Sequence, residues 1–220
     1  TIGQVLLTKD VMQSRERYRN ACNTLATLLK LGVLPIVNEN DTMVIDEIKV
    51  GDNDRLAAMV AQLVAADLLV LLSDVDGFYR DFGTDHQERL SVVASLDSAV
   101  RSLARSEGSK YSTGGMITKL DAAEMCQGAG IHTVIAAGED PGILARIIAG
   151  EDVGTLFPAG TRALPGKKHW IRHHLVKRGR LVIDSGAARA LAEQGKSLLA
   201  KGIIAVHGNF SEGDGVTIEH

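Results

Sequence analysis

Leu68-Leu69-Val70-Leu71-Leu72, followed directly by Ser73-Asp74-Val75-Asp76-Gly77, is the stretch of the chain that decides its fold class. Five consecutive aliphatic residues predict a strand whose two faces are both buried, as in parallel sheets packed between helices. The polar residues that follow predict either a simple turn or the carboxyl end of a strand at which an α/β sheet binds its ligand. The stretch therefore favours an α/β protein with a site beyond the end of this strand.

The segments on either side alternate between helix and strand. Helices are predicted by apolar residues spaced three to four apart and by capping residues, and strands by short aliphatic runs. The predicted helices cover residues 14–31, 52–64, 96–104, about 116–128 and 140–149, and the predicted strands cover residues 4–8, 33–37, 68–72 and 132–137. This order predicts a mostly parallel central sheet sandwiched between helices.

The chain has 220 residues, enough for one large domain or for a medium domain with a small one. Only 4% of the residues are aromatic and the net charge is −3, so stacking surfaces for nucleic acid are scarce and polyanions are not attracted overall. Cys22 and Cys126 lack metal or redox spacing and are expected to be reduced core thiols of a cytoplasmic protein. No stretch reaches the ~18 apolar residues that span a bilayer, so no membrane association is expected.

Residues 161–180 differ sharply in composition from the rest, with seven Lys or Arg, three His and no acidic residue. We expect a first domain at residues 1–160, a basic linker at 161–177 and a small β module at 178–220. The basic run around Trp170 favours a solvated linker face, with RNA or phosphate binding as the alternative. Its histidines fit no zinc pattern, so no protein-bound metal is expected.

One glycine-containing segment predicts an anion site, Thr113-Gly114-Gly115-Met116-Ile117-Thr118-Lys119. Its two glycines allow the backbone to approach an anion just before a helix, whose free N–H groups and dipole favour phosphate. Lys119 is expected in the first helical turn, where its ammonium could offset the charge on a transferring phosphoryl group. A glycine turn with threonine caps and a surface lysine is the alternative, because the segment does not match the Gly-x-x-x-x-Gly-Lys-Ser/Thr pattern.

Two acidic, amide-rich segments add groups that could grip a small charged metabolite, Asn38-Glu39-Asn40-Asp41 and Gly51-Asp52-Asn53-Asp54. Each could be only a polar turn or a helix cap, but a cap needs one such residue and the second segment has three. Asp54 is best placed to hold a lysine or a metal-bound nucleotide, while Asp52 and Asn53 could contact an ammonium or carboxylate group. With the strand end described above, these segments predict phosphoryl transfer from a nucleotide to a small charged metabolite.

The same segments, in this order, resemble the glutamate 5-kinases of the amino acid kinase family. The resemblance runs from about residue 3 to Ile171, and residues from about 178 onward resemble the start of a PUA domain. It implies an amino acid kinase fold followed by a small, truncated, PUA-like β-barrel. It also implies ATP-dependent phosphorylation of the γ-carboxylate of L-glutamate, the first step of proline biosynthesis, with Mg²⁺ carried by ATP and held largely by phosphate oxygens.

The resemblance also implies roles for individual residues. Lys119 would stabilise the transferred phosphoryl group, and Asp54 would orient the catalytic lysines. The implied glutamate contacts are Asn38, Asp41, Asp52 and Asn53, and the implied nucleotide contacts are Ser73, Asp74, Thr113, Gly114, Gly115, Met116, Ile117, Thr118 and Lys119. Because relatives are usually dimers or tetramers, a homo-oligomer is expected here, and because relatives are often inhibited by proline, proline is a candidate feedback inhibitor.

The family's amino-terminal strand and its Lys-x-Gly-Ser-Ser loop, which supplies a second catalytic lysine, are absent from these residues, as is a Ser-Ser-Gly-Ala segment. We therefore expect the chain to be part of a longer polypeptide and to be inactive alone. Two alternatives are another amino acid kinase acting on aspartate, acetylglutamate, carbamate or a nucleotide, and an RNA-binding protein whose kinase-like part is structural. The paired acidic segments and the PUA-like tail favour glutamate, and the overall acidity weighs against RNA.

Overall fold

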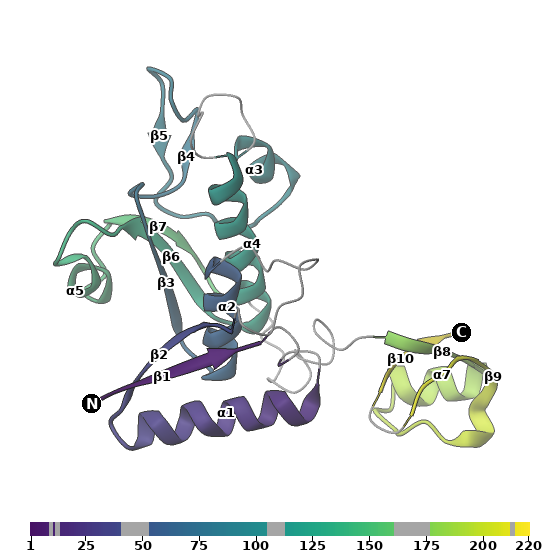
Figure 1. Ribbon diagram of the computed structural model, residues 1–220. Helices are drawn as coiled ribbons and strands as arrows, with labels where there is room; N and C mark the ends of the chain where they lie inside the picture. Colours follow the sequence, from purple (N-terminus) through teal and green to yellow (C-terminus); the bar gives the residue numbers. More distant parts are fainter. Residues whose placement is uncertain (9–10, 12–13, 41–52, 105–112, 161–176, 212–213) are drawn as a thin grey trace.

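The computed structural model describes residues 1–8, 11, 14–40, 53–104, 113–160, 177–211 and 214–220. They form a larger α/β unit and a smaller carboxyl-terminal unit (Figure 1). The elements of the larger unit are β1 (Ile2–Leu7), α1 (Arg15–Lys30), β2 (Leu34–Glu39), α2 (Asn53–Leu63), β3 (Leu68–Ser73), β4 (Tyr79–Arg80), β5 (Glu88–Arg89), α3 (Ser98–Leu103), α4 (Thr113–Ala129), β6 (His132–Ala137), α5 (Ile143–Ile148) and β7 (Gly154–Phe157). Those of the smaller unit are β8 (Lys177–Ile183), α7 (Ser185–Ala192), η3 (Ala200–Gly202), β9 (Ile203–Gly208) and β10 (Gly215–Glu219).

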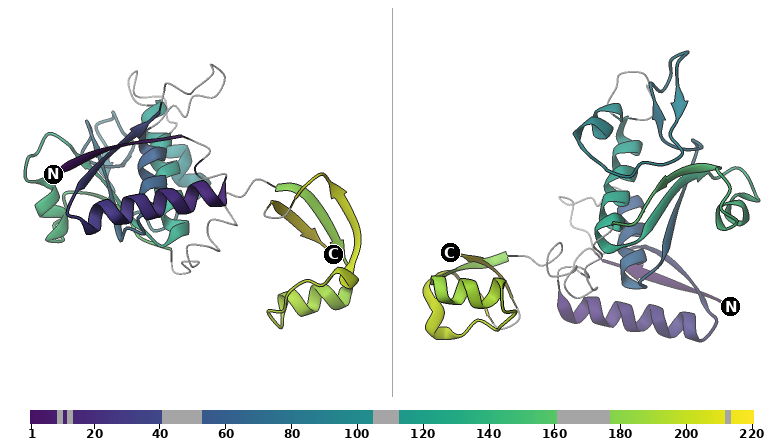
Figure 2. Two further views of the ribbon diagram at one scale, coloured as in Figure 1. Left: turned by 60° about the horizontal axis from the view of Figure 1, so that its bottom comes forward. Right: turned by 180° about the vertical axis from the view of Figure 1, so that it is seen from behind.

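The first helix connects two parallel strands, β1 and β2. Ser14 caps α1 by accepting a hydrogen bond from the backbone N–H of Arg17 at 3.4 Å, and Gly32, with a φ of +68°, ends it as the sequence predicts. Leu25, on the inward face of α1, is fully buried against the strands and α2. In Figures 1 and 2, α1 lies along the β1–β2 ribbon and covers one of its faces.

A second sheet contains β3, β6 and β7. β3 and β6 are parallel and in register from the Leu68–His132 pair to the Ser73–Ala137 pair, whereas β7 is antiparallel to β6. α4 packs against one face of β6 and α5 packs against the other, so this sheet has helices on both sides. The predicted strand at residues 68–72 is therefore confirmed, together with its parallel partner, but its predicted burial on both faces is not, because Leu71 is buried while Leu72 is 49% exposed.

The main hydrophobic core lies between α2, α4 and the β3–β6–β7 sheet. In it, fully buried Ala58 of α2 and Leu120 of α4 pack with Ile135 of β6. Phe78 and Phe157 belong to the same cluster, and their ring centroids lie 6.5 Å apart. Small residues on facing sides of two helices allow their backbones to approach closely, so α2 and α4 pack directly on each other. Burial raises the pKa of the Cys126 thiol in this core to about 11, consistent with the predicted inert core thiol.

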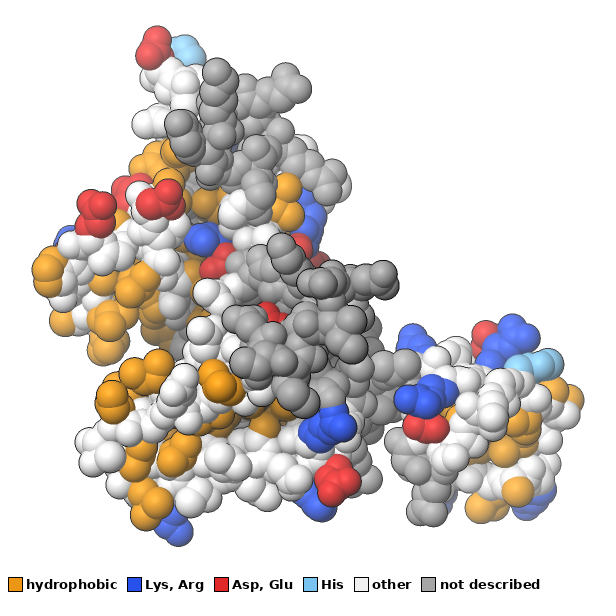
Figure 3. Space-filling model, in the orientation of Figure 1, with side chains coloured by type: hydrophobic (Ala, Val, Ile, Leu, Met, Phe, Trp, Pro, Cys, Tyr) orange, Lys and Arg blue, Asp and Glu red, His pale blue; other side chains and the backbone are white. Residues whose placement is uncertain are grey.

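The expected α/β architecture with parallel strands and flanking helices is confirmed, with one difference of detail. The described strands of the larger unit form separate sheets, β1–β2 and β3–β6–β7, next to the small β4–β5 hairpin, instead of one continuous sheet. The face of β1–β2 that points away from α1 is apolar and exposed, and Figure 3 shows hydrophobic side chains gathered over this part of the molecule. Its exposed residues are Ile2, Leu6, Leu34 and Ile36.

The smaller unit has its own sheet, in the order β10-β8-β9. β10 runs parallel to β8 and β9 runs antiparallel to it, and α7 begins at an Asp184 cap that accepts from the backbone N–H of Ala187 at 2.7 Å. The short strands around one helix agree with the predicted small β module. The predicted basic linker lies almost entirely outside the described residues, so the domain boundaries at 160 and 178 stay a prediction.

Thr155 of β7 connects the sheet to the turn that leaves β3. It is fully buried, and its hydroxyl accepts a hydrogen bond from the backbone N–H of Phe78 at 2.8 Å. Valine has the same shape without an acceptor, so Thr155→Val should lower the free energy of unfolding by about 1–3 kcal/mol, because a buried N–H loses its partner. Urea unfolding measures this, with the exposed Thr24→Val as the control, expected within about 0.5 kcal/mol of the wild type. Equal stability of the two variants would contradict the role given to this bond.

Candidate functional site

An ion pair between two helices lies at the centre of the candidate site. The Nζ atom of Lys119 on α4 lies 3.0 Å from Oδ2 of Asp54 in the first turn of α2. The side chains are only 16% and 15% exposed, so the pair is largely shielded from water. The amino end of α2 favours the Asp54 carboxylate through its free N–H groups and dipole. The expected contact of Asp54 with a lysine is therefore present, and the catalytic roles of Asp54 and Lys119 stay predictions.

Thr118 reaches the same carboxylate. Its Oγ1 lies 3.0 Å from Oδ2 of Asp54 and 2.7 Å from the carbonyl oxygen of Gly115, one helical turn earlier. An ionised carboxylate and a carbonyl oxygen only accept, so the single hydroxyl proton of Thr118 serves both acceptors. The sequence placed Thr118 in a nucleotide-binding segment and gave no sign of this contact with Asp54.

The glycine segment is helical, which differs from the predicted loop. α4 already begins at Thr113, so Gly114 and Gly115 lie inside the helix, and Lys119 lies in its second turn instead of its first. Met116, which follows the glycines, packs against the main core, and Leu120 is fully buried in it. This packing outweighs the low helix propensity of glycine, about 1 kcal/mol per residue relative to alanine.

Neither the backbone conformation nor crowding by neighbouring atoms requires a glycine at position 115. It is exposed in a regular helix, and no described atom beyond the helix's own backbone lies within 4 Å of the place where a β-carbon would stand. Glycine inside a helix destabilises it relative to alanine. The open backbone surface at Gly115 therefore leaves room for a ligand to approach the start of α4.

The carboxyl end of β3 carries the predicted Ser73 and Asp74. The Ser73 hydroxyl donates to Oδ1 of Asp74 at 3.0 Å, and the Ser73 carbonyl accepts from the Gly138 N–H at 2.8 Å, which holds the ends of β3 and β6 together. Beyond them, Tyr79 donates to Asp76 at 2.7 Å, and this hydrogen bond is the main cause of the raised pKa of Tyr79. In Figure 1, β3 runs towards the β4–β5 hairpin and α4 starts beside α3, so both ends lie on the same side of the unit.

The other predicted site residues are only partly described. Asn38 lies exposed at the carboxyl end of β2, where its Oδ1 accepts from the Glu39 N–H at 2.9 Å, and Asn53 is the exposed first residue of α2. Ile117 is half-buried in α4. Asp41 and Asp52, both predicted glutamate contacts, lie outside the described residues.

Arg101 of α3 is a structural residue of this region that the sequence did not reveal. Its guanidinium donates to Oδ1 of Asp121 at 2.8 Å and to Oε2 of Glu124 at 2.5 Å, both on α4. The hydrogen bond to Asp121 is the largest cause of the raised pKa of Arg101. This two-point contact ties α3 to the helix that carries Lys119. A pattern search could not find it, because the partners are about twenty residues apart on different helices.

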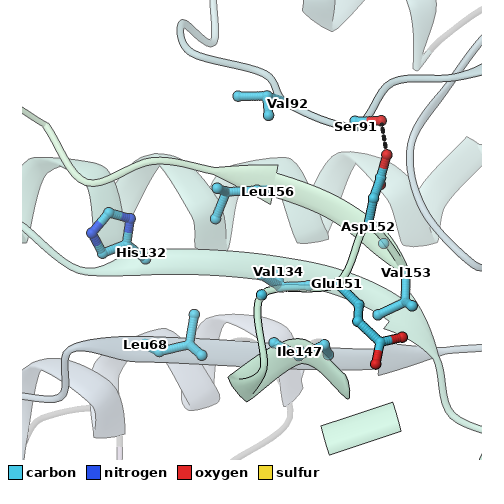
Figure 4. Close-up of a pocket in the computed structure, with 12 residues that line it drawn as sticks. Leu68, Ser91, Val92, His132, Val134, Ile147, Glu151, Asp152, Val153 and Leu156 are labelled. Carbon is cyan, nitrogen blue, oxygen red and sulfur yellow. Dashed lines mark hydrogen bonds between the residues drawn. The ribbon is translucent and has the colours of Figure 1, made fainter. Parts of the chain in front are cut away.

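A separate hollow of about 490 Å³ lies on the α5 face of the β3–β6–β7 sheet (Figure 4). Its walls are mainly apolar, and at its rim the Ser91 hydroxyl bonds to Asp152 at 2.6 Å. The apolar lining includes Leu68, Val92, Val134, Ile147, Val153 and Leu156. It lies on the face of the sheet opposite α4, so it does not belong to the Asp54–Lys119 site.

The described ranges contain no group of three or more His, Cys, Asp or Glu side chains placed to hold a metal ion. None of the helices in the described part of the chain has both the length and the apolar character needed to cross a membrane.

The family follows from comparison with known proteins. The model of the amino acid kinase family matches residues 1–137, which is more than half of the chain, and the model of the PUA domain matches residues 179–220. The chain therefore belongs to the amino acid kinase family and carries a PUA-like segment after its kinase-like unit.

Curated relatives carry a more specific name. The chain is 44% identical to the glutamate 5-kinase of Syntrophotalea carbinolica and 48% identical to that of Herpetosiphon aurantiacus, in both cases over 99% of this chain and 59% of the relative. It is 49% identical to the glutamate 5-kinase of Acidovorax ebreus, over 98% of this chain and 57% of the relative. The chain thus spans about three fifths of the length of the curated relatives that it matches.

Solved structures show more distant similarity. The carbamate kinase of Giardia lamblia, solved with AMP-PNP, superposes with a TM-score of 0.47 at 21% identity, covering 62% of this chain and 48% of that protein. The UMP kinase of Bacillus anthracis superposes with a TM-score of 0.47 at 15% identity, covering 73% of this chain and 59% of that protein.

Removing the ammonium should destabilise the protein. Lys119→Met removes the Lys119 ammonium from the largely buried Asp54 carboxylate, so the free energy of unfolding should fall by about 1–3 kcal/mol, less than for a fully buried pair. Urea unfolding followed by circular dichroism measures this. The exposed Lys196→Met is the control and should change stability by less than about 0.5 kcal/mol. A Lys119→Met variant as stable as the control would show that the pair does not form.

Proposed function

We propose that the protein containing this chain transfers the terminal phosphoryl group of ATP to the γ-carboxylate of L-glutamate, forming an acyl phosphate. One observation carries the proposal. The Lys119 ammonium, held by Asp54, lies one turn from the open backbone at Gly115 near the start of α4. A fixed cation next to free helix N–H groups is suited to an anion that gains charge during transfer.

The chemistry asks for positioning and charge stabilisation more than for a base. The attacking carboxylate of glutamate is ionised at neutral pH, because its ordinary pKa is about 4.3. Phosphoryl transfer spreads charge over the oxygens of the moving group, and catalysis consists mostly of aligning the reactants and offsetting that charge. The positive charge of Lys119 would offset the charge on the moving phosphoryl group, and Asp54 would hold the Lys119 ammonium in place.

The nucleotide would lie across the first turns of α4 and the carboxyl end of β3. Ser73 and Asp74 would face its polar part, and the backbone from Thr113 to Lys119 would face its phosphates, with Met116 contributing through its backbone because its side chain packs in the core. Mg²⁺ would arrive with ATP, since this ion keeps several waters and prefers phosphate oxygens to an all-protein cage. On the acceptor side, Asn38, Asp41, Asp52 and Asn53 would contact glutamate.

Similarity to curated relatives supports glutamate as the acceptor. The curated relatives named above are glutamate 5-kinases and match nearly the whole of this chain at 44% to 49% identity. The structural neighbours are named for other acceptors, but their similarity to the chain is too weak to support an acceptor assignment. Self-association, inhibition by proline and a cytoplasmic location stay predictions from the resemblance.

The test is an assay of the native gene product that contains these residues. Incubation with ATP, Mg²⁺ and L-glutamate, with hydroxylamine to trap the acyl phosphate as hydroxamate, should give product. Aspartate, N-acetylglutamate, carbamate and UMP should give little. Lys119→Met should lower kcat about 10²- to 10³-fold, as expected when a preorganised transition-state contact is lost, with the KM for glutamate nearly unchanged. Phosphorylation of a rival acceptor in place of glutamate would overturn the assignment.

Gly115 offers a second test, in which stability and function move in opposite directions. Gly115→Ala should raise the free energy of unfolding by about 0.5–1 kcal/mol through better helix propensity. It should also raise the KM for ATP at least about fivefold, because a methyl group fills the space through which the nucleotide would approach. The exposed Asn23→Ala in α1 gives a similar gain in helix propensity and should leave the KM for ATP unchanged. An unaltered KM in Gly115→Ala would remove Gly115 from the nucleotide site.

A further inference from the structure

We infer that Thr118 is a positioning residue, whose hydroxyl fixes the Asp54 carboxylate and thereby holds the Lys119 ammonium at the point of phosphoryl transfer. The inference rests on the function proposed above and assigns to Thr118 an action through Asp54. The sequence had pointed instead to direct nucleotide binding by this residue.

The geometry that carries the inference is the convergence of two donors on one oxygen. Thr118 Oγ1 and Lys119 Nζ each lie 3.0 Å from Oδ2 of Asp54. Adjacent residues of an α-helix point about 100° apart and do not face each other. A carboxylate on a neighbouring helix can meet both side chains only if it lies over the surface between them. The two contacts together therefore fix where the Asp54 carboxylate, which comes from α2, lies over the surface of α4.

Lys119 alone would hold Asp54 less firmly. A lysine has a flexible four-carbon stem and three rotatable donors, so a single ammonium–carboxylate contact tolerates many arrangements. Thr118 is β-branched and therefore stiff, and its rotamer is further set by the 2.7 Å contact of its hydroxyl with the Gly115 carbonyl. The hydroxyl proton is shared between this carbonyl at 2.7 Å and the charged carboxylate at 3.0 Å. The Thr118 hydroxyl thus restricts the Asp54–Lys119 ion pair to one arrangement, in which the carboxylate contacts both side chains.

The contact also links the two parts of the site. Gly115, whose carbonyl bonds Thr118, lies where the backbone of α4 is open to a ligand, and Asp54 lies at the start of α2 next to Asn53. Together with Lys119, Thr118 therefore holds the nucleotide end of α4 and the acceptor end of α2 in one arrangement.

The experiment compares Thr118→Val, which keeps the shape and removes the hydroxyl, with Thr118→Ser, which keeps the hydroxyl, in the native gene product. Thr118→Val should lower kcat about tenfold, the factor expected for losing one hydrogen bond to a charged group, with the KM for ATP changed less than about twofold. Thr118→Ser should recover more than about a third of the wild-type kcat. Thr118→Ala removes the same hydroxyl without a β-branch and is measured in parallel, in case the valine variant does not fold.

A second comparison asks whether Thr118 acts through Asp54. In an Asp54→Asn background, adding Thr118→Val should change kcat by less than about twofold, because the two residues act as one unit. The matched control is Thr27→Val in α1, since Thr27 makes the same kind of hydroxyl-to-carbonyl bond, to Asn23 at 2.7 Å, away from Asp54 and Lys119. Its kcat should equal that of the wild type.

Three results would overturn the inference. A Thr118→Val variant with unchanged kcat and a KM for ATP raised fivefold or more would make Thr118 a direct nucleotide contact. Unchanged values of both would deny it any role, and a full tenfold loss on top of Asp54→Asn would show that it does not act through Asp54. If the wild type phosphorylates another acceptor, the same variants are measured on that acceptor, so failure of the glutamate assignment is distinguished from failure of this inference.

Discussion

The contact between the Asp54 carboxylate and the Lys119 ammonium is the interaction on which the candidate site depends. Both side chains are about 85% removed from solvent, where an unpaired charge would be costly. The start of α2 favours the anion, and the Thr118 hydroxyl adds a second donor to the same oxygen. With these supports, the ammonium stays at a defined place. That is the state in which a lysine can offset the charge of a moving phosphoryl group.

The core sets the distance between the two helices that carry this pair. Ala58 on α2 and Leu120 on α4 are fully buried in one cluster with Ile135 of β6, so the helices are held against each other and against the sheet. The in-register parallel pairing of β3 and β6 then brings the ends of both strands to the same edge. Arg101 ties α3 to Asp121 and Glu124 in the middle of α4, and Thr155 fixes the turn after Gly77. Each of these contacts limits how far the first turns of α4 can move from β3.

The sequence predicted the elements that depend on local chemistry. The helix at residues 14–31, the aliphatic strand β3 and an acidic residue at the start of α2 placed to hold a lysine were legible, because helical periodicity, aliphatic runs and charge at helix starts leave local patterns. The helical state of Gly114 and Gly115 was not, because it depends on core packing of Met116 and Leu120, which outweighs local propensity. The contacts of Thr118 and Arg101 were equally hidden, since they are fixed by how two helices lie on each other. The division of the strands into separate sheets likewise depends on tertiary arrangement.

The most direct test of the central claim is a double-mutant cycle on Asp54 and Lys119, with unfolding free energies measured for the wild type, Asp54→Asn, Lys119→Met and the double variant. If the two side chains form the ion pair described here, the changes will not add, and the coupling energy will be about 1–3 kcal/mol. If the two changes in unfolding free energy add to within about 0.3 kcal/mol, the side chains do not interact, and the ion pair on which the proposed phosphoryl-transfer site depends does not form.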